Sequence, residues 1–540
     1  MTNCLRIPRP ATLVRALVSA GHLATACATA RQFLAGPLPR NAAAEVRAAL
    51  VTALALRGNG PKAVAEAEQL LAVGELPAAL VATVSATRLI VLAGCDAEGA
   101  EQLARSLSRG VDPRQPVLRA TALAVLANAH WRRGRLIDAC ALARAACRAD
   151  GGTAVPFGSD EALAPARGFP PAVLADKLAS LGEIAEADQV LRHFADAVGD
   201  FDRGSHGVVV AALQARIHAR AGRFEMAFEL ASHAVALAEW ARAHSLIPYT
   251  RLVLTEVAVR LGDLGTAAAS LAAAGRNLWW SALAEMGNRH AAATLQLAEA
   301  AEGTVAAGTR LSRDFAWLAG APALSAGPTT AAWLVRLALA VGDDHLADQA
   351  VTTARRLATA NPRLAGVETA ATHAEAVLHA DPDLLSQVVT RHTDPWSRAR
   401  TLEDRALVLA EQSPAADRQA VADAWGRALA GYRETGARGD EIRVEATLRR
   451  LGRRRRGGRG RPADSGWPQL TDQEAAVAEL VAQGMTNQGA ARRLHLSPHT
   501  VNFHLRTIFR KLGIRSRVEL AHLHGAHSVS PFAPDSQALA

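Results

Sequence analysis

Residues 494–517, LHLSPHTVNFHLRTIFRKLGIRSR, include side chains that can bond to the edges of nucleobases. At 100° per residue, a helix over this stretch has two different faces. One face is apolar and consists of Val501, Leu505, Ile508 and Leu512. The other has no acidic residue and consists of His499, Asn502, Phe503, Arg506 and Arg510. Amide, guanidinium and imidazole groups bond base edges, and an aromatic ring can touch thymine methyl groups, so this outer face suits the major groove of DNA.

Start and stop signals around this stretch predict the helices that position it. Ser and Thr accept hydrogen bonds at helix N-termini, Pro fits the first helical position, and Gly ends helices. The predicted N-caps are Thr471 (a capping box with Glu474), Thr486, Ser497 and Ser516, and the predicted stops are Gly484 and Gly513. The four helices then cover residues 472–483, 487–494, 498–512 and 517–524. A short helix, a tight turn and a longer helix form a helix-turn-helix.

The third of these helices is the predicted recognition helix, because such a helix lies in the major groove with its N-terminal residues on the bases. The residues predicted to contact bases are Asn502, Phe503 and Arg506. The residues predicted to contact phosphates, aided by the N-termini of two helices, are Thr486, Asn487, Ser497, His499, Thr500, Thr507, Arg510 and Lys511. For any one of these residues, the alternative is a plainly solvated polar side chain.

The positive charge of the chain is concentrated at the same end. The net charge is +9, and residues 449–540 contain fifteen Lys and Arg against six Asp and Glu, so the rest is neutral. A polyanion-binding module is therefore expected at this end. Residues 449–466, RRLGRRRRGGRGRPADSG, contain eight arginines among glycines and predict a flexible linker. This linker acts either as a spacer alone or also neutralises phosphates.

The segment from Leu470 to His524 resembles the LuxR-type DNA-binding domain throughout. The matching landmarks are Leu-Thr-x-x-Glu at its start, Gly484, Asn487, Ala491, Leu494, SPHTV, His504, KLG and RSR. The resemblance implies transcription regulation, with a homodimer on inverted half-sites of double-stranded DNA. It also implies dimerisation through the fourth helix, by Arg517, Leu520, Ala521 and His524.

The sequence departs from the family pattern at three positions in this segment. Asn502 stands where the family often has lysine. Gly489 and Ala490 replace the usual Glu and a larger aliphatic residue, which removes a capping partner and core volume. The second helix is therefore expected to be weaker by about 1–2 kcal/mol. Residues 427–452 also look like the run that precedes this domain in the large LuxR-type regulators, which usually carry an N-terminal NTPase before their repeats. This sequence starts within the repeats, so it resembles either a shortened relative that lacks the NTPase or a C-terminal portion of such a regulator.

Residues 1–448 have the pattern of a neutral helical repeat. Apolar residues recur at helical spacing between glycines 36 to 48 positions apart, namely Gly21, Gly58, Gly94, Gly134, Gly182, Gly222, Gly262, Gly303 and Gly342. The pattern Gly-x-apolar-x-x-Ala follows Gly21, Gly134, Gly182, Gly222 and Gly262. A glycine with positive φ ends one helix, and the alanine lets the next helix approach closely. Stacked hairpins share a core that no single hairpin can bury, so the region resembles the tetratricopeptide-like repeats; an irregular helical domain is the alternative.

The chain as a whole gives little sign of catalysis. None of its three lysines precedes Ser or Thr as a P-loop requires, and HExxH and GxSxG are absent, so we expect no catalytic residue, cofactor or metal. The five cysteines form no ligand cluster and are expected to be reduced thiols. We find no signal peptide and no stretch of 18 apolar residues, which favours a cytoplasmic protein without membrane contact. Seven tryptophans could line a groove, although core packing is commoner: Trp131, Trp240, Trp279, Trp280, Trp333, Trp396 and Trp425.

The predicted fold is all-α, with four parts. Residues 1–448 form a tetratricopeptide-like solenoid of helical hairpins, 449–466 a linker, 467–527 a four-helix LuxR-type helix-turn-helix domain, and 528–540 a disordered tail. The predicted function is sequence-specific DNA-binding transcription regulation, with a protein or small-molecule effector received by the repeat. The alternatives are an interaction scaffold with a vestigial DNA-binding domain, and a degenerate ATP-dependent signalling regulator.

Overall fold

The computed structural model of the protein describes residues 9–110, 115–149, 165–198, 204–275, 286–412, 418–450, 470, 472–494, 498–514 and 516–527. The contacts of the backbone divide the chain into two compact units, residues 1–453 and residues 454–540, and each is described by itself. The described residues form helices and turns and contain no strand, so the all-α class is confirmed.

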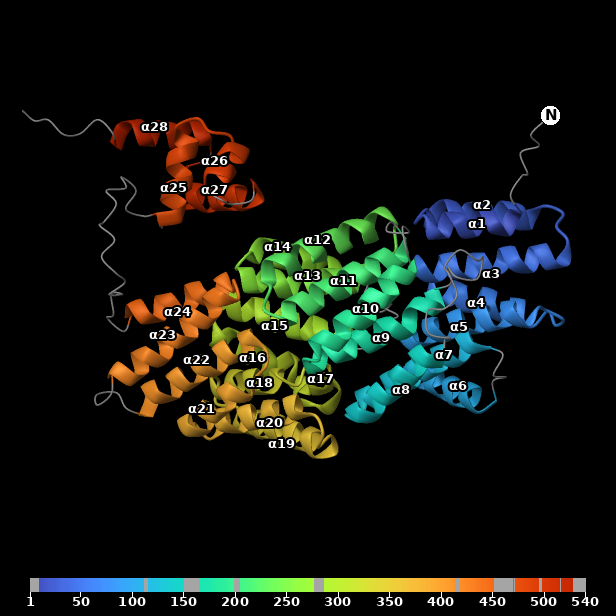
Figure 1. Cartoon of the computed structure of the whole chain (residues 1–540), viewed down its shortest axis with the longest axis horizontal. Coiled ribbons are helices and arrows are strands. Elements are labelled where there is room, and N and C mark those ends of the chain that lie inside the picture. Colours follow the sequence, from blue (N-terminus) through green and yellow to red (C-terminus); the bar gives the residue numbers. More distant parts are fainter. Residues whose placement is uncertain are drawn as a thin grey trace, which may run out of the picture. The chain divides into compact units, whose positions relative to one another are not determined.

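The first unit contains the helices from α1 to α24 (Figure 1). The first eight are α1 (Pro10–Ser19), α2 (Leu23–Ala35), α3 (Arg40–Leu56), α4 (Gly60–Leu71), α5 (Ala78–Cys95), α6 (Ala97–Gly110), α7 (Pro116–Arg132) and α8 (Leu136–Ala149). The next eight are α9 (Pro165–Leu181), α10 (Ile184–Val198), α11 (Ser205–Arg220), α12 (Phe224–Trp240), α13 (Ile247–Leu261), α14 (Leu264–Gly275), α15 (Met286–Glu302) and α16 (Thr304–Asp314). After the short 3₁₀ helix η1 (Ala316–Ala319) come α17 (Ala321–Ala326), α18 (Thr330–Leu339), α19 (Asp344–Ala360), α20 (Ala365–Leu378), α21 (Pro382–Arg391), α22 (Pro395–Gln412), α23 (Arg418–Glu434) and α24 (Arg438–Arg450).

These helices pair as hairpins that stack on one another. Helix α7 packs on α8, α11 on α12, and α13 on α14. The first helix of one hairpin also packs on the first helix of the next, as α9 does with α11 and α11 with α13. Figure 1 shows the stack proceeding in chain order from α1 to α24. The apolar faces merge into cores that span several hairpins, which is the tetratricopeptide-like arrangement predicted from the repeat.

The glycines that punctuate the repeat take the predicted backbone conformation at eight of nine positions. Positive φ angles are found at Gly21, Gly58, Gly134, Gly182, Gly222, Gly262, Gly303 and Gly342. The prediction for Gly94 is wrong, because this residue lies inside α5. That helix ends at Cys95. The next residue, Asp96, has a φ of −141°, and its carboxylate accepts a hydrogen bond from the backbone N–H of Gly99 at 2.9 Å. One aspartate thus ends α5 and caps α6, so this turn needs no left-handed residue.

The alanine five residues after each motif glycine lies at a contact between helices. The five alanines, each 0% exposed, are Ala26, Ala139, Ala187, Ala227 and Ala267. After Gly303 the same position is occupied by Gly308, where an added Cβ would lie 2.3 Å from the carbonyl oxygen of Leu337. At this position the requirement for a small residue is steric, since any larger side chain would push α16 away from α18.

The stack coils, so that hairpins distant in the sequence also touch. Asn361, in the loop after α19, is 1% exposed and accepts hydrogen bonds from the backbone N–H groups of Leu136 at 2.8 Å and Ile137 at 3.1 Å. Its amide donates to the carbonyl oxygen of Gly134, 227 positions away, at 2.7 Å. This side chain therefore caps α8 from another part of the solenoid and helps to fix its curvature.

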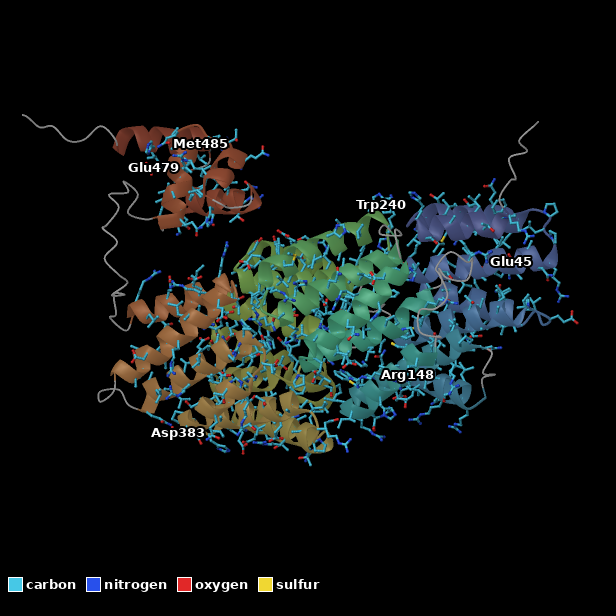
Figure 2. All side chains as sticks on the ribbon, viewed as in Figure 1. Glu45, Arg148, Trp240, Asp383, Glu479 and Met485 are labelled. Carbon is cyan, nitrogen blue, oxygen red and sulfur yellow. The ribbon has the colours of Figure 1, made fainter. Side chains whose placement is uncertain are left out.

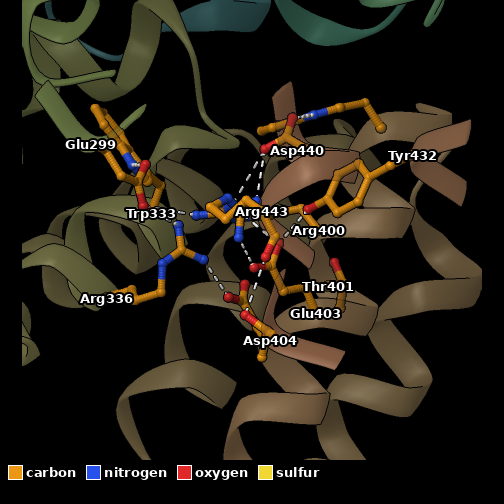
Figure 3. Close-up of polar contacts among 12 residues, drawn as sticks. Glu299, Trp333, Arg336, Arg400, Thr401, Glu403, Asp404, Tyr432, Asp440 and Arg443 are labelled. Atoms are coloured by element: carbon orange, nitrogen blue, oxygen red, sulfur yellow. Dashed lines mark hydrogen bonds and ion pairs between the residues drawn. The ribbon is translucent and has the colours of Figure 1, made fainter. Parts of the chain in front are cut away.

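A buried ionic cluster joins α22, α23 and α24 (Figure 3). The Glu403 carboxylate, 2% exposed, accepts hydrogen bonds from Tyr432 Oη at 2.6 Å, Arg443 Nη2 at 2.9 Å and Arg400 Nη1 at 3.2 Å. Burial alone would raise the pKa of Glu403, but Arg443 and Arg400 lower it to about 2. The carboxylate is therefore ionised, as a buried charge with good partners can be.

The cluster continues toward a pair of buried histidines. Asp404 forms an ion pair with Arg336 of α18 and lies 2.9 Å from Nε2 of His373. The ring of His392 lies 3.4 Å from the other nitrogen of His373. Burial, together with His373, lowers the pKa of His392 to about 3, so His392 is neutral at physiological pH.

Most of the tryptophans and cysteines in the described part of the chain pack within the repeat. Trp131, Trp333 and Trp425 are buried, whereas Trp240 is 50% exposed (Figure 2). Trp396 is half-buried and donates to Asp440, and Trp279 and Trp280 lie outside the described residues. The free cysteines are Cys27 and Cys140, which are buried, Cys147, partly buried, and Cys95, exposed; Cys4 lies outside the described residues.

One helix differs from the expectation about apolar stretches. By length and composition, α5 is apolar enough to cross a membrane, although the sequence was expected to contain no such stretch. In the repeat, α5 packs against α3, α4, α6 and α7, and Val84, Leu89 and Val91 belong to the core. Arg88 in its middle pairs with Glu68 at 2.6 Å. These contacts account for its apolar composition.

Candidate nucleic-acid interface

The second unit contains four helices close to the predicted ones. They are α25 (Asp472–Ala482), α26 (Asn487–Leu494), α27 (Pro498–Leu512) and α28 (Arg517–His527). The fourth continues three residues beyond its predicted end. Gly484 and Gly513, the predicted stops, have φ angles of +90° and +69°. The predicted short helix and the longer helix that follows it are therefore confirmed as α26 and α27, and the predicted turn between them lies outside the described residues.

Two of the predicted N-caps are formed by the described residues. The hydroxyl of Thr486 accepts a hydrogen bond from the backbone N–H of Gly489 at 3.1 Å. The hydroxyl of Ser516 accepts from the backbone N–H of Glu519 at 3.2 Å and donates to the Glu519 carboxylate at 3.0 Å. These contacts fix the starts of α26 and α28. The other predicted caps, Thr471 and Ser497, lie outside the described residues.

The inner face of α27 is buried in the core of the unit. Val501 and Ile508 are 0% exposed and Leu505 is 5% exposed. They share one hydrophobic cluster with Val477 of α25 and Leu520 of α28. Burial of this stripe fixes the rotation of α27 about its axis, so the opposite side of the helix must face outward.

The outer face of α27 presents Asn502 and Arg506, and both are exposed. They lie four positions apart, so they occupy the same face about one turn, or ~6 Å, from each other. An amide and a guanidinium at this spacing can donate to and accept from neighbouring base edges. Phe503, a third predicted base contact, is a residue of α27 whose side chain lies outside the described ones.

The predicted phosphate contacts occupy different positions in the unit. Thr486 is exposed, and Thr500 and Thr507 on α27 are partly buried. His499 and Arg510 are residues of α27 whose side chains lie outside the described ones. The helix N-terminus at Asn487 lies beside α28, because the Arg517 guanidinium donates to the Asn487 side-chain oxygen at 3.0 Å.

Lys511 makes a contact that the sequence did not suggest. Its ammonium donates to both carboxylate oxygens of Glu474, at 2.6 Å and 2.9 Å. Glu474 is 6% exposed, and this pair ties the last turn of α27 to α25. Glu474 was expected to cap α25 with Thr471, and only that local role was visible in the sequence. This salt bridge joins residues 37 positions apart in the sequence, so it depends on the tertiary fold.

The predicted dimerisation residues of α28 divide between two environments. Leu520 is 0% exposed and belongs to the core of its own unit. Arg517 and Ala521, one turn apart, are exposed, and His524 is partly buried. The outward side of α28 is therefore formed around Arg517 and Ala521, with Leu520 directed inward.

Comparison with known proteins points to this same segment. Residues 468–524 match the model of the family described as bacterial regulatory proteins, luxR family. An HTH-type transcriptional regulator of Mycobacterium bovis is 49% identical over 67 residues, which are 12% of this chain and 8% of that protein. The transcriptional regulatory protein UhpA of Salmonella typhimurium is 49% identical over 53 residues, 10% of this chain and 27% of UhpA. The chain thus spans only a small part of the length of these relatives.

A solved structure is similar to a larger part of the chain. It is the crystal structure of a Rap protein complexed with competence and sporulation factor. The match covers 76% of this chain and 99% of the Rap chain, with 12% sequence identity and a TM-score of 0.39.

Proposed function

Because residues 468–524 form a DNA-binding domain of the luxR family of bacterial regulatory proteins, we propose that this protein is a sequence-specific transcriptional regulator. Helix α27 lies in the major groove in this proposal, with Asn502, Phe503 and Arg506 on base edges. The phosphates are contacted by Thr486 and Asn487 at the start of α26 and by Thr500, Thr507 and Arg510 of α27. Two copies dimerise through the outward side of α28, and the dimer binds two inverted half-sites. The protein acts in the cytoplasm.

The observation that supports this most strongly is the division of α27 into two faces. Its apolar stripe is buried against α25 and α28, while the polar Asn502 and Arg506 are exposed one turn apart. A solvated helix has no need to keep acidic residues off its exposed face, whereas a polyanion repels them. The excess of positive charge in residues 449–540 supports the same function.

The repeat is proposed to receive a protein or small-molecule signal and to control the DNA-binding domain. Stacked helical hairpins form extended concave surfaces, which is the physical basis for this role. Its cores are separate from that of the second unit, so a signal there can act without rebuilding the DNA-binding fold.

Selection of bound sequences from a random pool of duplex DNA by the purified full chain tests the proposal. We expect enrichment of one motif, arranged as two inverted half-sites about one helical turn apart. Recovery of DNA without any common motif would contradict sequence-specific regulation.

The alternative function, an interaction scaffold whose DNA-binding domain is vestigial, is favoured by one observation. Gly489 lies in the first turn of α26, the helix that supports α27 in a helix-turn-helix, and glycine is about 1 kcal/mol less favourable than alanine within a helix. Binding of residues 467–527 to promoter DNA, measured at several salt concentrations, separates the two functions. A regulator gives salt-dependent binding with a preferred sequence, and a vestigial domain gives none.

A further inference from the structure

Two adjoining cavities lie along the first helices of successive hairpins in the repeat. The first is a partly open cavity of about 80 Å³ between α11, α13, α15, α17 and α18, and the second is a partly open cavity of about 60 Å³ that extends to α22. The residues that line both are Arg220, Glu256, Gln296, Thr330 and Trp333. These volumes are below those of pockets for drug-sized ligands, so a molecule of about the size of an amino acid is the largest that fits.

Two opposite charges line both cavities without meeting each other. Arg220 of α11 and Glu256 of α13 are partly buried, and neither forms an ion pair or hydrogen bond with any residue that the structure describes. Nε of Arg220 and the side-chain oxygen of Gln296 are buried and have no partner among the described residues. Partly buried charges are costly without partners, so a guanidinium and a carboxylate held apart in one cavity leave room for a complementary molecule between them.

The other charged groups around the cavities are already engaged. Arg216 and Arg289 both pair with Asp176, at 2.7 Å and 3.0 Å. Glu299 accepts from Trp333 Nε1 at 2.8 Å and pairs with Arg400 at 3.2 Å (Figure 3).

Two further charges belong to neighbouring contacts. Arg260 lies over the ring of Trp396 at 3.9 Å and pairs with Asp440. The carboxylate of Asp394 caps α22 by accepting from the backbone N–H of Ser397 at 3.2 Å. Burial raises the pKa of Asp394 and the nearby charge of Arg220 lowers it, although the two side chains form no ion pair. Arg220 and Glu256 are the charged lining residues in the described part of the chain that form neither an ion pair nor a hydrogen bond.

Besides the polar Asn288 and Thr330, the remaining walls include apolar and aromatic side chains. Leu252 and Val253 of α13 are each 4% exposed, and the rings of Tyr249 and Trp333 provide flat buried surfaces beside them. Such walls suit an uncharged aliphatic or aromatic group.

We propose that the two adjoining cavities together form a binding site for a small zwitterion with an apolar side chain, which is the chemistry of a free apolar amino acid. Arg220 pairs with its carboxylate, Glu256 with its ammonium group, and the side-chain oxygen of Gln296 accepts an N–H. Its side chain packs against Leu252 and Val253. The ligand then bridges the first helices of three hairpins, so binding changes the stability of that part of the solenoid. The inference rests on the proposed role of the repeat as the receiver of a signal.

Calorimetric titration of the purified full chain without DNA tests the site and requires no DNA binding, so its failure is distinct from failure of the proposed regulatory function. The probes are L-valine, L-leucine, L-isoleucine and L-phenylalanine. Matched controls are 4-methylpentanoate, which lacks the ammonium group of leucine, and isoamylamine, which lacks its carboxylate. We expect saturable binding of at least one amino acid and at least tenfold weaker binding of the two controls. Absence of binding by all four amino acids, or equal binding of the controls, would overturn the proposal.

Variants locate the site. Arg220→Gln and Glu256→Gln should each weaken binding at least tenfold. The control variants Arg356→Gln and Glu229→Gln remove exposed charges outside the cavity and should leave binding unchanged. Circular dichroism and the melting temperature of each variant verify folding, and the ligand controls remain decisive if a variant does not fold. Unchanged binding in both cavity variants would place the ligand elsewhere and overturn the assignment.

Discussion

Replacing Glu403 by glutamine tests how much the buried ionic cluster stabilises the solenoid. The substitution leaves Arg400 and Arg443 facing a neutral amide in the interior. The folded protein lowers the pKa of Glu403 from 4.5 to about 2, which at about 1.4 kcal/mol per unit corresponds to roughly 3 kcal/mol at neutral pH. Removal of one partner from a buried ion pair typically costs about 3–5 kcal/mol, so we expect Glu403→Gln to destabilise the first unit by about 3 kcal/mol.

The assay is unfolding of the full chain in guanidinium chloride, followed by tryptophan fluorescence. Trp396 donates to Asp440 in the same cluster and therefore reports on it. The control is Glu368→Gln, whose carboxylate is 56% exposed and pairs with Arg355 at 2.8 Å. An exposed pair contributes at most about 1 kcal/mol. A cost below about 1 kcal/mol for Glu403→Gln, or equal costs for the two variants, would refute the assigned role of the cluster.

The sign of the pH dependence follows from the same pKa. Because the folded-state pKa of Glu403 lies below its unfolded value, its contribution is fully present above pH 4.5 and is lost as the pH falls toward 2. The difference in stability between the wild-type chain and Glu403→Gln should therefore shrink over this interval. A constant difference would show that the lost contacts are not electrostatic.

Three further predictions concern α26, α27 and the buried histidines. Gly489→Ala should stabilise residues 467–527 by about 1 kcal/mol in denaturant unfolding, because alanine favours the helix and its Cβ would lie at an ordinary 3.4 Å from Thr486 Oγ1. Gly489→Glu should stabilise them further by completing a capping box. Destabilisation by both substitutions would contradict this prediction. Lys511→Gln should destabilise the same segment by about 1 kcal/mol, because the Lys511 ammonium pairs with Glu474. The same pairing should leave the salt dependence of DNA binding unchanged in this variant. A salt slope smaller by about one unit would instead identify Lys511 as a phosphate contact. His392→Gln should flatten the pH dependence of the melting temperature. The folded-state pKa of His392, about 3, lies below its unfolded value of 6.5, so the wild-type chain loses stability as the pH falls from 6.5 toward 3. Parallel pH profiles for the two proteins would contradict this prediction.

Local signals predicted most of the helices and failed where a side chain had a distant partner. The glycines at Gly134 and Gly262 mark turns correctly because a positive φ is a local requirement that glycine meets best. Gly94 fits the same spacing, but Asp96 two residues later provides another way to end the helix. Spacing alone does not distinguish these cases, because the choice depends on which residue follows.

The buried polar groups could not be predicted in the same way. The sequence around α22 has Arg400 and Glu403 three positions apart, as on many solvated helices. Their burial depends on α24, which brings Arg443 onto the same carboxylate from 40 positions away. Arg220 and Glu256 likewise look like ordinary surface charges until the coiling of the solenoid places them on one cavity.

The candidate DNA-binding surface was more accessible to sequence reasoning. The inner stripe and the outer Asn502 and Arg506 both follow from helical periodicity, and the structure places them as expected. The pairing of Lys511 with Glu474 could not be found in this way, because it joins two helices whose packing the periodicity does not specify.

The most direct test of the proposed function is the effect of Arg506→Ala on the affinity of the full chain for its selected sequence and for random duplex DNA. Loss of a base contact should weaken binding to the selected sequence by about 1–3 kcal/mol and leave binding to random DNA nearly unchanged. The control is Arg493→Ala, which removes an exposed arginine of α26 and should affect both DNAs to the same extent. Equal weakening on both DNAs by Arg506→Ala would contradict base reading by α27.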